Sequence, residues 1–107
     1  MEDREGWRVC GEAANGAQAV EIAARLKPNI AVLDLLMPAM NGMDTIRRIR
    51  KVSPDTEILI YTMHTSEQLV RDAIRAGVRG FVLKFPGARH LRRAVEALAN
   101  HKSYLFI

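Results

Sequence analysis

Short, continuous apolar runs alternate along the chain with stretches in which apolar residues recur every three or four positions. The runs at 30–33, 58–61 and 80–83 have the pattern of parallel strands that are covered on both faces. A weaker alternation predicts a further strand over 7–13, ahead of the turn signal Asn15-Gly16. The tail at 104–107 is apolar, but its pattern does not assign it to an element.

The intervening stretches predict amphipathic helices over 17–27, after Asp44 (with its inward stripe at Ile46, Ile49 and Val52), over 66–77 and over 88–100. Pro28 ends the first of them, Asp44 is the expected cap of the second, and Gly77 is a suitable stop for the third. Strand and helix alternate four times with short connections, which is typical of an α/β domain built on a parallel sheet.

Composition supports one domain and narrows the function. The chain has 107 residues, 49% hydrophobic and 26% charged, which is the balance of a soluble globular protein. Its net charge of +4 comes from basic residues scattered without aromatic interleaving, so we expect no nucleic-acid binding by this chain itself. No apolar run reaches the ~20 residues that span a bilayer, so we expect a cytoplasmic protein without membrane contact. Cys10 is the only cysteine, and because it lies in an apolar stretch we expect it to pack as a small hydrophobic residue.

Three predicted strands end in chemically useful side chains: Asp34, Thr62 and Lys84. In parallel sheets, ligands bind outside the carboxyl ends of the strands, so we expect these three residues to meet at one edge. A carboxylate can attack a phosphoryl group, while a hydroxyl and an ammonium can bind its oxygens. A divalent cation would normally complete such a site. The set therefore points to phosphoryl transfer.

The residues around this set resemble a known family. Residues 32–42 (VLDLLMPAMNG) resemble the phosphorylation-site segment of response-regulator receivers, and residues 76–84 (AGVRGFVLK) resemble the family's other signature. Residues 10–16 (CGEAANG) are similar to the NarL/FixJ (LuxR-type) subgroup. The resemblance implies that residues 1–107 form one flavodoxin-like receiver domain, incomplete at its N-terminus and without an output domain. The first strand and most of the first helix of the family would be missing.

Roles follow from this resemblance. It implies that Asp34 accepts a phosphoryl group from a histidine kinase and that Thr62 and Lys84 contact that group. Phe81 takes the aromatic switch position, and Asp34 with the backbone carbonyl of Leu36 would bind Mg²⁺. In the subgroup, such a receiver normally controls a LuxR-type DNA-binding output.

The chain departs from the family pattern at its beginning. The family's acidic pair, which completes the magnesium site, is absent, because Glu2 and Asp3 align with the end of the missing first helix. We therefore expect weak magnesium binding or none. The missing strand would also leave a sheet edge open, so either the strand at Val9 pairs directly with the strand at Val32 or a second copy completes the sheet as a homodimer. Met63, in place of a small residue, is expected to narrow access to Asp34.

Two other functions compete with a working receiver. One is a receiver remnant that is not phosphorylated and acts as an interaction or dimerisation module, which the missing acidic pair favours. The other is a phosphatase of the haloacid-dehalogenase type with Asp34 as nucleophile. Those enzymes carry a D-x-D pattern, whereas position 36 here is leucine. Without a second carboxylate as acid and base, we expect no enzyme.

Overall fold

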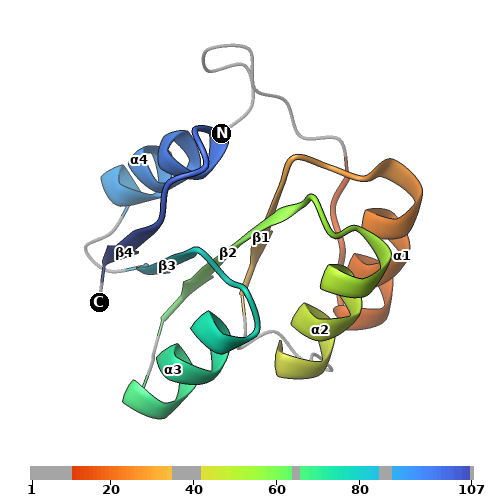
Figure 1. The fold of residues 1–107 in the computed structure, drawn as a ribbon, viewed down its shortest axis with the longest axis horizontal. Helices are drawn as coiled ribbons and strands as arrows, with labels where there is room; N and C mark the ends of the chain where they lie inside the picture. The colour runs from red at the N-terminus through yellow and green to blue at the C-terminus, as the bar shows by residue number, and fades with distance from the viewer. Residues whose placement is uncertain (1–10, 35–41, 64–65, 85–87, 107) are drawn as a thin grey trace.

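The computed structural model describes residues 11–34, 42–63, 66–84 and 88–106 (Figure 1). In these ranges, helices and strands alternate in the order α1 (Gly16–Leu26), β1 (Ile30–Leu33), α2 (Gly42–Val52), β2 (Glu57–Thr62), α3 (Glu67–Arg75), β3 (Gly80–Leu83), α4 (Ala88–Ala99) and β4 (Tyr104–Phe106). The four strands pair in parallel in the order β1-β2-β3-β4. This is the parallel α/β architecture of a flavodoxin-like receiver, as the sequence predicted.

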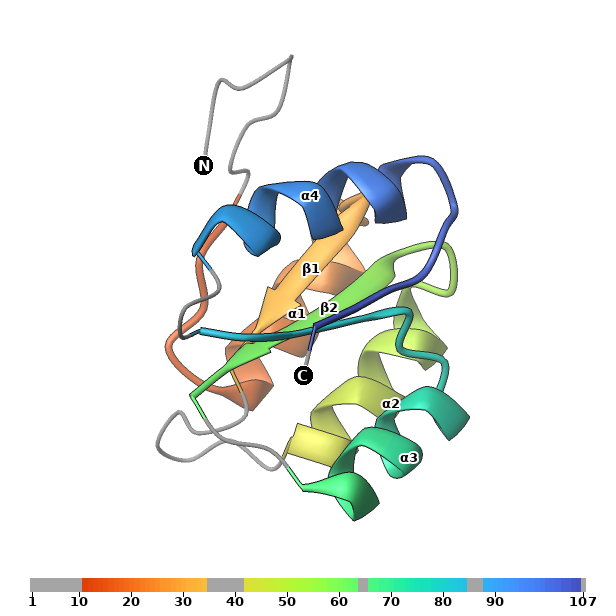
Figure 2. The ribbon, with the colours of Figure 1, turned by 90° about the vertical axis from the view of Figure 1, so that its left-hand side faces the viewer.

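Helices cover both faces of the sheet. Helices α1, α2 and α3 lie on one side, and α4 lies on the other (Figure 2). Successive residues of β2 point alternately into the two layers: Ile58 and Ile60 pack with the first group of helices, and Leu59 packs with α4. All three side chains are fully buried. Burial on both faces explains why this strand is a continuous apolar run.

Local signals fix several of the element ends. The side chain of Asn15 accepts a hydrogen bond from the backbone N–H of Gln18, and Ser66 accepts one from Leu69, so both residues cap helices. Gly77 has a φ of 99°, a left-handed conformation that favours glycine where the chain leaves α3. The predicted stop at Gly77 is therefore confirmed.

The structure corrects the predictions from the sequence at two places and assigns a third segment that they left open. Residues 11–13 are not a strand, while 7–10 lie outside the described residues. Residues 11–13 are Gly, Glu and Ala, which are depleted in strands, and they face β1 across a pocket. Helix α2 begins at Gly42, which places Asp44 in its first turn and not at its cap; there it pairs with Arg48 at 3.7 Å. The unassigned tail supplies β4, which pairs with β3.

Among the described residues, no helix combines the length and the apolar character needed to cross a membrane.

Candidate functional site

Three neighbouring strands bring Asp34, Thr62 and Lys84 together. Thr62 is the last residue of β2, and Asp34 and Lys84 directly follow β1 and β3. The strand registers align these ends, because Leu33 lies opposite Ile60 and Thr62 lies opposite Leu83. The backbone N–H of Lys84 also donates to the carbonyl of Thr62 at 2.8 Å. The predicted meeting of the three side chains at one sheet edge is therefore confirmed.

The Asp34 carboxylate accepts a hydrogen bond on each of its oxygens. The Thr62 hydroxyl donates to Oδ1 at 3.2 Å, and the Lys84 ammonium donates to Oδ2 at 2.6 Å. The side chains of Asp34 and Lys84 are 22% and 30% exposed, whereas Thr62 is fully buried. The acidic group can thus still be reached from solvent while two donors hold its orientation. Such donors can also bind oxygen atoms on which negative charge develops.

Tyr61 is a member of this site that the sequence did not reveal. Its aromatic ring lies 5.5 Å from Lys84 Nζ, measured to the ring centroid, with the ammonium over the ring. The residue precedes Thr62 in β2, and its side chain packs against the cluster beneath α4. In the sequence it looks like one more apolar residue of a buried strand, so only the contact with Lys84 marks it.

Phe81 lies in the core. Its side chain is fully buried among the residues under α1, α2 and α3, and it pairs in register with Ile60. Its role as a switch stays a prediction.

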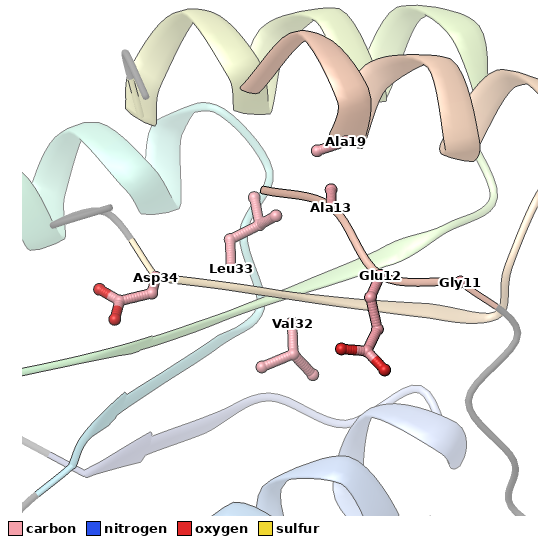
Figure 3. A pocket seen from close by; sticks show the side chains of 7 residues that line it. All are labelled: Gly11, Glu12, Ala13, Ala19, Val32, Leu33 and Asp34. Carbon is pink, nitrogen blue, oxygen red and sulfur yellow. The ribbon is translucent and has the colours of Figure 1, made fainter. Parts of the chain in front are cut away.

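A pocket of about 230 Å³ lies beside β1, next to Asp34. Its walls come from residues 11–13, from Ala19 on α1 and from residues 32–34 (Figure 3). Figure 3 shows two carboxylates on the pocket, with that of Asp34 at the end of β1 and that of Glu12 beside Val32. In the sequence, Glu12 is noticeable only as part of the family-like segment CGEAANG. The local sequence pattern does not predict that its side chain lines this pocket.

Among the described residues, no three His, Cys, Asp or Glu side chains lie close enough together to hold a metal ion. Leu36, Glu2 and Asp3 lie outside the described residues. Met63 is 44% exposed, and whether it narrows access to Asp34 stays a prediction.

Comparison with known proteins gives a consistent result. The profile of the family described as "Response regulator receiver domain" matches residues 1–96. The chemotaxis protein CheY of Thermotoga maritima is 41% identical over 95 residues, which are 89% of this chain and 77% of that protein. The nitrate/nitrite response regulator protein NarL of Escherichia coli is 36% identical over 91 residues, 85% of this chain and 42% of NarL. The chain thus spans less than half of that regulator.

The solved structures include a two-component response regulator of the LuxR family from an Aurantimonas species. It superimposes with a TM-score of 0.89 at 33% identity, over 96% of this chain and 74% of that one. Asp34, Thr62 and Lys84 all fall within the residues matched by the family profile.

Proposed function

This chain belongs to the response regulator receiver family, and from that membership we propose that Asp34 accepts a phosphoryl group from a histidine kinase. The observation that carries the proposal is the partly exposed carboxylate of Asp34, with the Lys84 ammonium on one oxygen and the Thr62 hydroxyl on the other. Receivers are generally signalling modules and not enzymes, and we propose the same for this chain.

In the proposed transfer, one carboxylate oxygen of Asp34 attacks the phosphorus of a phosphorylated kinase histidine. A phosphorus–oxygen bond forms, the phosphorus–nitrogen bond breaks, and the imidazole leaves with the electron pair. Lys84 and Thr62 already donate to the carboxylate, so a small shift brings the same donors to the phosphoryl oxygens. Positioned donors of this kind are the main source of catalysis in phosphoryl transfer.

Magnesium fits the described residues poorly. The ion prefers an octahedron of oxygen ligands, of which proteins often supply one or two carboxylates, and the Lys84 ammonium already occupies one oxygen of Asp34. We therefore predict weak binding, with Asp34 and the Leu36 carbonyl as the ligands from this chain.

We further propose that this receiver controls a LuxR-type DNA-binding output in the cytoplasm, in line with the transcriptional regulators that it resembles. Any DNA contact would belong to that output and not to the described receiver.

Phosphorylation can be tested directly. The chain is incubated with acetyl phosphate or phosphoramidate and magnesium, and intact mass is measured for one added phosphoryl group. We expect the adduct in the unaltered chain, its loss in Asp34→Asn, and its retention in Asp44→Asn, a matched control on the exposed face of α2. If no adduct forms where a complete receiver is labelled, the proposal fails and a non-phosphorylated interaction module takes its place.

A further inference from the structure

Among the described residues, the Lys84 ammonium contacts one charged group and one aromatic ring. It donates to Asp34 Oδ2 at 2.6 Å and lies 5.5 Å from the centroid of the Tyr61 ring. A cation within about 6 Å of a ring centroid, over the ring face, is attracted by the negative face of the aromatic ring. Because the Lys84 side chain is only 30% exposed, water screens this attraction less than it would at an open surface.

The two contacts respond differently to phosphorylation of Asp34. The carboxylate attracts the ammonium only while it is a carboxylate, since the attacking oxygen becomes part of an acyl phosphate. The ring of Tyr61 takes no part in that change and attracts the ammonium before and after it. A lysine side chain is long and flexible, with a single point charge at its end. During the transfer the ammonium has to shift from Asp34 Oδ2 to the phosphoryl oxygens, and the contact with the ring limits where this flexible side chain goes while it shifts.

We propose that Tyr61 is a positioning residue, whose ring holds the Lys84 ammonium at the sheet edge, ready to bind the phosphoryl group on Asp34. This inference rests on the proposed function of Asp34. In this proposal, the ring acts through Lys84 and does not itself bind the phosphoryl group. Positioning Lys84 in this way requires an aromatic face at position 61 and does not require the tyrosine hydroxyl.

A simple packing role for Tyr61 makes different predictions. The side chain also packs against the apolar cluster beneath α4, which includes Leu59 and Val82. Leucine would satisfy much of that packing but has no aromatic face, whereas phenylalanine keeps both. Tyr61→Phe and Tyr61→Leu therefore separate the two roles, with thermal unfolding of each variant showing that it is folded.

The first measurement is the rate of adduct formation with acetyl phosphate. We expect Tyr61→Phe to be labelled at the rate of the unaltered chain and Tyr61→Leu to be labelled about three- to tenfold more slowly, the effect of losing one partly buried cation–π contact. In a Lys84→Gln background, Tyr61→Leu should cause no further slowing. Equal rates for the unaltered chain and Tyr61→Leu, or an undiminished slowing in the Lys84→Gln background, would overturn the inference.

The second measurement needs no phosphorylation. In the unphosphorylated protein, the ε-CH2 protons of Lys84, identified by their loss in Lys84→Gln, should show an upfield ring-current shift in the NMR spectrum. We expect the shift to persist in Tyr61→Phe and to vanish in Tyr61→Leu. If the unaltered chain forms no adduct, the proposed function fails, and the ring-current shift still decides whether Tyr61 holds Lys84. A Lys84 signal that is the same in both variants refutes the positioning role.

Discussion

The ion pair between Asp34 and Lys84 should stabilise the fold as well as serve the site. Replacing Asp34 with asparagine preserves the size of the side chain and removes its charge. Lys84, whose ammonium lies 2.6 Å from Oδ2, would then face a neutral amide. Because the two side chains are only 22% and 30% exposed, the ammonium could recover only part of its lost interaction from water. We therefore predict that Asp34→Asn lowers the free energy of unfolding.

The size of the loss can be bounded. Two unit charges about 4 Å apart attract by about 4 kcal/mol near a protein surface, but the cost of removing both from water cancels much of this gain. A hydrogen bond to a charged group contributes about 1.5–3 kcal/mol net. The amide oxygen of asparagine can still accept from Lys84, and the site is partly hydrated, so the lower end applies. The expected loss is about 1–2 kcal/mol.

A double-mutant cycle in urea measures this interaction. Free energies of unfolding are compared for the unaltered chain, Asp34→Asn, Lys84→Gln and the double variant, and we expect a coupling energy of about 1 kcal/mol or more. Asp44→Asn serves as control, since it breaks the exposed pair with Arg48 and should cost less than about 0.5 kcal/mol. Additive single effects, or a gain of stability in Asp34→Asn, would show that the pair does not stabilise the fold.

Two more predictions concern the sheet. A Cβ at Gly80 would lie 2.6 Å from Leu59 Cδ1 and 3.0 Å from Leu98 Cδ1. Gly80→Ala should therefore lower the free energy of unfolding in urea by about 1–3 kcal/mol. An unchanged midpoint of urea unfolding would contradict the close packing of β3 against α4. If a second copy covers the edge at β1, light scattering should give twice the chain mass of 12.0 kDa, and Val32→Lys should shift the protein to monomer. A monomer at every concentration would exclude the homodimer.

The parts of the fold that the sequence predicts well are those with a strong local cause. Strand β2 is predicted correctly from the sequence. Its residues Ile58, Leu59 and Ile60 are all fully buried, and burial on both faces requires a continuous apolar run. The three site residues follow from strand ends alone, since parallel strands in register must place their ends at one edge. Their chemical roles come from family resemblance and remain to be measured.

Other features depend on partners distant in the sequence. Strand β4 has only three residues and no clear alternation, and it is a strand because Tyr104 pairs with Gly80 across the sheet. Tyr61 gains a role only through a lysine 23 positions later, whose ammonium reaches its ring once β2 and β3 are paired. Because aspartate is a common helix cap, the sequence predicted Asp44 as the cap of α2. The helix begins two residues before Asp44, at Gly42, so Asp44 lies in its first turn.

The placement of Asp34, Thr62 and Lys84 requires only the pairing of β1 with β2 and of β2 with β3. The two hydrogen bonds described above for the Asp34 carboxylate come from Thr62 and Lys84, at the ends of β2 and β3, whereas residues 11–13 lie across the pocket from β1. The geometry of the acceptor site is therefore separable from whatever occupies the outer edge of the sheet. If phosphorylation proves slow while the Asp34–Lys84 coupling energy is intact, a misplaced carboxylate is excluded as the cause, and weak magnesium binding is the next cause to test. In that case, raising the magnesium concentration should increase the labelling rate, because a weak site far from saturation responds in proportion to the free ion.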